Sequence, residues 1–226
     1  MAAPASLYLA KIILPETEEP LTRGIIKTDI DHGHRNIIDA ASAGASEGMK
    51  LAINIAAMLI AFLAFIAMIN YGLSWLDKGF VQIGTHFGIH WMSEPLSLEW
   101  VFGKIFSPAA FLMGVEPNDV PKVGELLGKK LVVNEFVAYV DLTSKYTAGS
   151  EHEVVNMSKR SFRLSTYALT GFANFASIGI QIGGIGAMAP ERRKDLARLG
   201  WRALFTGFLA TLLNAALAGT LGTLDD

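Results

Sequence analysis

The sequence predicts an all-α integral membrane protein, and three observations lead to this class. The 226 residues are 51% hydrophobic. Only 18% are charged, whereas average soluble domains carry about 25% charged residues. Charge is also unevenly distributed, because residues 51–76, 164–190 and 203–224 contain no Asp, Glu, Lys or Arg. Each stretch is long enough to cross a bilayer, which takes roughly 20 apolar residues. We therefore expect one multi-pass membrane domain over residues 1–226.

A soluble helical bundle is the alternative, and the pattern of side chains argues against it. The helices of such a bundle would show a polar face every third or fourth residue. Residues 53–63 contain only Asn54 as a polar side chain, so this segment is expected to face lipid. The net charge of −2 gives no sign of nucleic acid as a partner. The sequence has no cysteine, which removes disulfides and thiolate metal sites.

The segments between the apolar stretches are predicted in chain order. Residues 15–50 are polar and acidic, so we expect a loop with one short surface helix. Residues 77–95 are also expected to form a loop. Residues 96–114 form an apolar helix that contains Lys104 and Pro108 and is too short to span. An interfacial position is expected for this helix.

Residues 121–148 are predicted to form a re-entrant hairpin. The segment is moderately apolar but is interrupted by Lys129, Lys130, Asn134 and Glu135. It is too polar to face lipid, and irregular backbone survives at membrane depth only where protein or water covers it. Glu135 is flanked by apolar residues, and an acid at membrane depth is a candidate functional group. The alternative is a hairpin tip that merely reaches water.

The stretch 164–190 is predicted to be a broken helix, because it holds five glycines and several polar residues at membrane depth. Transporters use discontinuous helices of this kind to bind substrate near the midplane. Asn174 and Ser177 lie three residues apart and are expected to share one face. The alternative is close helix packing, since Gly179 and Gly183 form a small-residue contact pattern. That alternative does not account for the polar pair.

Orientation follows from basic residues. Residues 191–202 hold five cations, and we expect them to form a cytoplasmic loop, with the C-terminus outside. Lys159, Arg160 and Arg163 argue weakly for the opposite orientation.

No catalytic arrangement is visible, so the sequence does not predict an enzyme. It contains no phosphate-binding glycine loop and no nucleophile elbow. His86 and His90 have the i, i+4 spacing of metal ligands on a helix, but an interfacial position beside Trp91 is the preferred interpretation. We expect no metal site in this chain.

Four segments resemble the concentrative nucleoside transporter family. The run Asn134 to Tyr139 (NEFVAY) resembles the signature of that family, as does Gly171 to Ile180 (GFANFASIGI). Gly183 to Arg193 (GGIGAMAPERR) and Ala10 to Glu18 (AKIILPETE) are similar to it as well. These segments are long, ordered and spread over most of the chain, so the resemblance is specific.

The resemblance implies a homotrimer in the cell membrane whose protomers contain inverted repeats, re-entrant hairpins and broken helices. Residues 47–76 would be the long scaffold helix at the trimer interface. Glu135, Asn174 and Ser177 would hold the ribose hydroxyls of a nucleoside, and Phe172 would flank its base. A carboxylate suits this role because charge-assisted hydrogen bonds are the stronger kind.

The implied function is cation-coupled uptake of nucleosides by alternating access, with sodium or a proton as the coupling ion. The base-binding hairpin of the first repeat is absent from this sequence. The chain begins in an apolar stretch whose first charge is Lys11. We therefore expect the first repeat and most of the cation site to lie upstream of it. Two alternatives stay open at this point, namely a transporter of the same architecture for another hydroxylated solute and a non-transporting membrane scaffold or channel subunit. The base preference and the choice of coupling ion also stay open.

Overall fold

The computed structural model is mostly helical in the part of the chain that it describes, and that part has no β-strand. The described residues are 2–17, 19, 36–86, 96–146 and 157–221. The helices are α1 (Ala2–Ile13), α2 (Ile37–His86), α3 (Leu98–Leu112), α4 (Val120–Val132), α5 (Glu135–Tyr146), α6 (Lys159–Ala168), α7 (Phe175–Met188) and α8 (Arg193–Leu221), with short 3-10 turns at Pro117–Asp119 and Pro190–Arg192.

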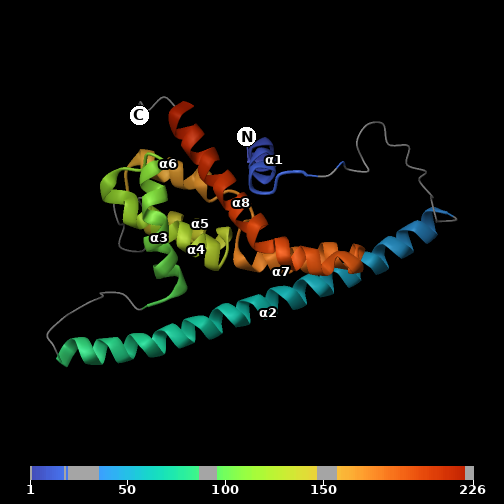
Figure 1. The fold of residues 1–226 in the computed structure, drawn as a ribbon, viewed down its shortest axis with the longest axis horizontal. Coiled ribbons are helices and arrows are strands. Elements are labelled where there is room, and N and C mark those ends of the chain that lie inside the picture. Colours follow the sequence, from blue (N-terminus) through green and yellow to red (C-terminus); the bar gives the residue numbers. More distant parts are fainter. Residues whose placement is uncertain (1, 18, 20–35, 87–95, 147–156, 222–226) are drawn as a thin grey trace.

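Helix α2 is a single rod of 50 residues that lies along one side of the molecule, and the other helices lie on the other side of it (Figure 1). Among the described residues two helices, α2 and α8, are long and apolar enough to cross a membrane. Only 6% of the most apolar window of α2 is buried within the chain, against 39% for α8. A core helix of a soluble protein would be mostly buried, so the surface of α2 must be covered by lipid or by another protein.

Two loop predictions were wrong in part, because α2 extends farther at both ends than its apolar stretch does. Residues 15–50 are expected to form a loop with one short surface helix, and the resemblance places the start of the long helix at residue 47. Helix α2 instead begins at Ile37. Residues 77–86, also expected to be a loop, form its last turns. The segment 37–50 is rich in Ala and has helix-favouring Glu47, Met49 and Lys50. A helix can project beyond the apolar layer, so loss of hydrophobicity does not mark its end.

The predicted hairpin is confirmed as a helical hairpin, although its depth in a membrane stays a prediction. Helices α4 and α5 are joined only by Val133 and Asn134. Helix α3 packs closely along α4. A Cβ placed on Gly128 of α4 would lie 2.5 Å from the carbonyl oxygen of Glu99 in α3, so only glycine permits this approach. The short helix predicted at 96–114 is confirmed as α3, and its interfacial position stays a prediction.

The stretch 164–190 is a broken helix, as predicted, but the break lies before the glycine-rich run. Helix α6 ends at Ala168 and α7 begins at Phe175. Gly171, inside the break, has φ +87°, which favours glycine. The later glycines are helical. Gly179 lies against the ring of Phe62 in α2, and Gly183 lies against Met58. Close packing is therefore the role of this pair, and the break depends on other residues.

The basic segment 191–202, predicted to be a loop, is mostly helical. Residues Pro190–Arg192 form one 3-10 turn and α8 begins at Arg193, so Arg202 lies within the third turn of α8. The cations therefore extend the last apolar helix at its N-terminal end. As in α2, charge marks where the apolar part of the helix ends rather than where the helix itself ends.

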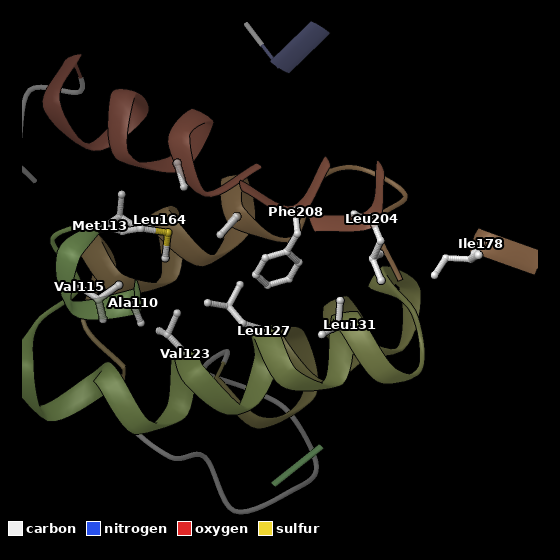
Figure 2. Packing of buried hydrophobic residues seen from close by; sticks show 13 residues of the cluster. Ala110, Met113, Val115, Val123, Leu127, Leu131, Leu164, Ile178, Leu204 and Phe208 are labelled. Carbon is white, nitrogen blue, oxygen red and sulfur yellow. The ribbon is translucent and has the colours of Figure 1, made fainter. Parts of the chain in front are cut away.

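The core lies between α3, α4, α6 and α8. Leu127 and Leu131 of α4 are completely buried, and Phe208 of α8 packs against them (Figure 2). Leu164 of α6, Ala110 of α3 and Ile178 of α7 belong to the same cluster. The core thus fixes the hairpin against the two halves of the broken helix and against α8.

Candidate functional site

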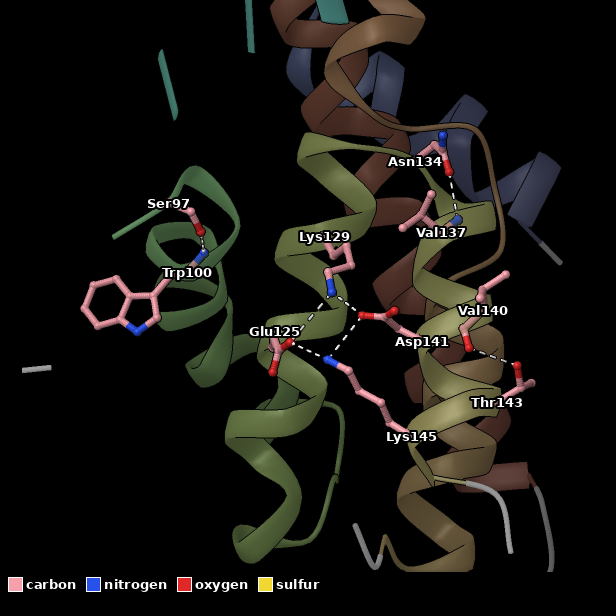
Figure 3. Close-up of polar contacts among 10 residues, drawn as sticks. All are labelled: Ser97, Trp100, Glu125, Lys129, Asn134, Val137, Val140, Asp141, Thr143 and Lys145. Carbon is pink, nitrogen blue, oxygen red and sulfur yellow. Dashed lines mark hydrogen bonds and ion pairs between the residues drawn. The ribbon is translucent and has the colours of Figure 1, made fainter. Parts of the chain in front are cut away.

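The tip of the hairpin is a capped helix start that presents a carboxylate. Asn134 accepts a hydrogen bond at Oδ1 from the backbone N–H of Val137, at 2.8 Å, and thereby caps α5 (Figure 3). Glu135 is the first residue of α5 and is half-buried. An acid in the first turn is stabilised by the positive end of the helix dipole. The hairpin tip therefore places the Glu135 side chain where the dipole of α5 favours negative charge.

Four charged residues join the two arms of the hairpin farther from the tip. Lys129 of α4 forms an ion pair with Asp141 of α5, and Lys145 of α5 pairs with Glu125 of α4 at 3.2 Å (Figure 3). Lys145 also lies 3.3 Å from Asp141. These pairs hold α4 and α5 together at one flank, so the position of Glu135 is tied to that of α4.

The break in the second helix ends in a capping box. The Oδ1 atom of Asn174 accepts a hydrogen bond from the backbone N–H of Ser177 at 2.8 Å. In return, the Oγ atom of Ser177 accepts from the backbone N–H of Asn174 at 3.3 Å. Such a reciprocal pair satisfies two of the unpaired donors at a helix start. Both residues are buried, so their polar groups lie inside the protein.

The hairpin tip and the break meet at one hydrogen bond. The Nδ2 atom of Asn174 donates to Oε2 of Glu135 at 3.2 Å. The predicted residues Glu135, Asn174 and Ser177 therefore form a continuous hydrogen-bonded set from α5 to α7. The carboxylate also lies at the N-terminal end of α7, where the helix dipole favours negative charge. Glu135 keeps further acceptor capacity, because an ionised carboxylate accepts about four hydrogen bonds.

Phe172 lies in the same break but is not part of this set. Its side chain is 52% exposed. It lines a cavity of about 490 Å³ together with Ser177, and Gln181 of α7 and Thr211 of α8 contribute to the same wall. The cavity is bounded by the break, α7, α8 and the N-terminal helix α1. Ser177 thus belongs both to the capping box and to an open apolar cavity with an aromatic wall.

Lys130 is a buried residue whose role the sequence analysis missed. It has no exposed surface. Its Nζ atom donates to the backbone oxygens of Ala168 and Thr170 at 2.8 and 2.9 Å and to Oγ1 of Thr211 at 2.8 Å. Ala168 ends α6, so the ammonium lies at the negative end of that helix. Lys130 therefore places a positive charge at the negative, C-terminal end of α6. Glu135 places a negative charge at the positive, N-terminal end of α7.

A signal for Lys130 was available in the helical spacing. Successive residues in a helix point about 100° apart, so Lys129 and Lys130 cannot share a face. Lys129 lies one turn after Glu125, on a polar face, whereas Lys130 lies one turn after Leu126 and Leu127. The second lysine must therefore point toward the apolar side of α4, where only a buried partner set can stabilise it.

The described residues contain no group of three or more His, Asp or Glu that could hold a metal ion. His90 lies outside the described residues, and only the backbone of His86 is described, so the interpretation of that pair stays a prediction.

The fold and the site together define a class of protein. It is a helical membrane protein in which a hairpin tip meets an interrupted helix, and half-helix ends of opposite polarity face buried polar side chains. This arrangement is typical of transporters with discontinuous helices.

The chain belongs to the family described as Na+ dependent nucleoside transporter C-terminus, whose model matches residues 1–219. It is 46% identical to sodium/nucleoside cotransporter 1 of Homo sapiens over 230 residues, which covers 98% of this chain and 34% of the human protein. It is 44% identical to the uncharacterized transporter YutK of Bacillus subtilis (strain 168), covering 97% of this chain and 50% of the relative. The family is one of transporters, not enzymes.

Solved structures of CNTnw share the fold. A CNTnw variant in an outward-facing state matches 97% of this chain and 48% of its own, with 36% identity and a TM-score of 0.78. CNTnw in an inward-facing substrate-bound state matches 96% of this chain and 47% of its own, with 39% identity and a TM-score of 0.65. The chain thus spans about half the length of these structures and a third to a half of the curated relatives.

Proposed function

We propose that residues 1–226 form the substrate-binding half of a transporter that takes up nucleosides across the cell membrane, coupled to sodium. The hydrogen-bonded set of Glu135, Asn174 and Ser177 carries this proposal. In it the carboxylate of Glu135 accepts hydrogen bonds from ribose hydroxyls. Asn174 and Ser177 contact the same hydroxyls, and Phe172 flanks the base. The relatives named as sodium/nucleoside cotransporters support both the solute and the ion.

Several further properties belong to the same proposal. The α4–α5 hairpin is re-entrant, with its tip at the depth where α6 ends and α7 begins. The upstream half supplies the rest of the substrate site and the coupling-ion site, because only half of the related structures is covered here. Transport proceeds by alternating access. Three copies assemble through α2, whose exposed apolar surface needs a partner or lipid.

The chemistry of the site favours a sugar over a purely apolar solute. A carboxylate with free lone pairs beside a buried amide and hydroxyl can pair with neighbouring hydroxyl groups. A solute lacking those hydroxyls leaves the remaining acceptors of Glu135 without a partner, which a binding site rejects strongly. The cavity with Phe172 on its wall offers an apolar surface for a flat ring. A different hydroxylated solute is the second candidate, and competition by uridine, adenosine and free nucleobases separates the two.

The test uses the full-length transporter and Glu135→Gln, which keeps the volume and removes the charge. Loss of a charge-assisted hydrogen bond costs roughly 1.5–3 kcal/mol, which corresponds to roughly ten- to hundred-fold weaker binding. Calorimetric titration with a ribonucleoside should show this loss. A dideoxynucleoside should bind wild type much more weakly than the ribonucleoside, and the variant should discriminate far less between the two.

Glu125→Gln makes the same chemical change on the same hairpin, away from the tip, and should leave discrimination between the two solutes intact. Non-additive losses identify partners in one contact. Additive losses for Glu135→Gln and for removal of the hydroxyls would show that Glu135 does not touch the sugar.

A further inference from the structure

The ammonium of Lys130 is enclosed by a complete set of oxygen ligands. Its three contacts come from two backbone carbonyls of the break, Ala168 and Thr170, and from the hydroxyl of Thr211 in α8. An ammonium has three N–H donors and no acceptor, so each donor has one partner. Nζ lies over the Phe208 ring, 5.3 Å from the ring centroid, which adds a favourable contact with the positive charge.

The surroundings of each of the three oxygens make it an acceptor toward the ammonium. The Thr211 hydroxyl donates to the backbone oxygen of Phe208 at 2.8 Å, so its lone pairs point to the ammonium. The carbonyls of Ala168 and Thr170 are at or just beyond the end of α6, where helix carbonyls lack intrahelical partners. The three oxygens therefore converge on a point where a positive charge is favoured, whichever group supplies it.

Oxygen sets of this kind also bind dissolved cations. Transporters with broken helices coordinate monovalent ions through unwound carbonyls and the C-terminal ends of half-helices, and carbonyl oxygens replace the hydration shell of potassium in channels. The contacts around Lys130 measure 2.8–2.9 Å. These distances suit an ion of ammonium or potassium size better than the smaller sodium ion.

We propose that Ala168, Thr170 and Thr211 form a monovalent-cation site that the Lys130 ammonium occupies permanently, so that this half of the protein carries a tethered cation in place of a dissolved one. The break between α6 and α7 then stays ordered without a bound salt ion. Ion coupling must act elsewhere in the full-length transporter. The proposal concerns the folded chain itself and does not depend on which solute is carried.

The test removes the Lys130 ammonium by substitution and adds dissolved monovalent cations to the purified full-length protein. Lys130→Ala vacates both the charge and the space of the side chain. Thermal unfolding is followed in potassium, ammonium and choline chlorides at equal ionic strength, without sodium and without substrate. The variant should unfold at a lower temperature than wild type in choline. It should regain about 2–5 °C in potassium or ammonium once the salt exceeds the dissociation constant about tenfold.

Three controls make the result specific. Lys130→Met fills the space without charge, so its Tm should not respond to the choice of cation. Lys129→Ala removes the neighbouring lysine and should not respond either. Adding Thr211→Val to Lys130→Ala removes one ligand and should abolish the cation response of the single variant.

Equal Tm values of Lys130→Ala in all three salts would overturn the proposal, because a merely structural lysine leaves no cation-selective site. If the variant does not survive extraction in choline, the amount of monodisperse protein recovered in each salt replaces Tm. Equal recovery in the three salts would then overturn it. Nucleoside binding is not measured, so this outcome is independent of the proposed substrate.

Discussion

Asn174 is the residue in which structure and proposed function meet. One side-chain atom caps α7 by accepting from Ser177, and the other donates to Glu135. The side chain is 1% exposed, so neither bond can be replaced freely by water. An amide is required here because it offers an acceptor and a donor on one planar group. A carboxylate lacks the donor, and a serine hydroxyl holds donor and acceptor on one atom that lies too near the backbone to reach Glu135.

Substitutions at Asn174 should separate the two roles. Asn174→Ala removes both bonds and should lower the free energy of unfolding by about 0.5–2 kcal/mol through loss of the cap. Asn174→Ser restores a preferred cap but is too short to donate to Glu135. The serine variant should therefore recover most of the stability and little of the nucleoside affinity.

Denaturant unfolding and calorimetric binding on the same samples measure the two quantities. If Asn174→Ser restored both equally, the contact with Glu135 would have no part in binding.

The residues of the candidate site were predictable from the sequence, but the hydrogen bonds that connect them were not. The polar pair at Asn174 and Ser177 and the acid at Glu135 are visible in the sequence, because polar groups at membrane depth are costly. Their mutual hydrogen bonds depend on where the helix breaks. From the sequence, the break in the helix was expected within the glycine-rich run, since glycine is a poor helix former. In the structure tertiary contact with Phe62 and Met58 keeps that run helical.

At the scale of helices, the packing of α3 on α4 positions the hairpin. The backbones approach at Gly128, where a Cβ would also lie 2.6 Å from the backbone nitrogen of Gly103. Backbone atoms cannot move aside as the end of a flexible side chain can. This contact therefore sets the distance between the two helices. Because the hairpin tip follows α4, the contact also determines the position of Glu135.

Two glycine substitutions test this contact. Gly128→Ala should lower the free energy of unfolding by about 1–3 kcal/mol, as expected when a methyl group is forced into a packed interior. Gly72 in α2 has no atom within 4 Å of a built Cβ, so Gly72→Ala should instead stabilise the helix by about 0.5–1 kcal/mol.

Chemical unfolding of both variants checks the signs. The prediction is refuted if Gly128→Ala is as stable as wild type, since α3 and α4 would then separate without cost.

At the scale of the whole molecule, the fold class followed from composition, whereas helix limits did not. Charge-free stretches located α2, α8 and the broken helix, because lipid excludes charge. The same criterion failed at residues 37–50 and 191–202, which are charged and helical. Hydropathy reports where a helix is immersed. Backbone hydrogen bonding decides where the helix ends, and this hydrogen bonding continues where the helix projects into water.

The cations at the start of α8 predict its direction. Five basic residues in 191–202 should face the cytoplasm. The sequence has no cysteine, so single cysteines can be introduced at Lys194 and at Asp225, which lies beyond the described residues. In intact cells an impermeant thiol reagent should label the variant at position 225 and spare that at position 194. The reverse labelling pattern would show that α8 runs in the opposite direction.

The length of α2 links the site to the thickness of the bilayer. A helix of 50 residues extends about 75 Å, more than twice the roughly 30 Å of hydrocarbon that it crosses. Such a helix lies obliquely or projects from both sides, and thinner or thicker lipid changes its inclination. Helix α7 rests on α2 through Gly179 and Gly183. We therefore expect a change of inclination to reach the capped end of α7, so that hydrophobic mismatch alters the geometry around Asn174.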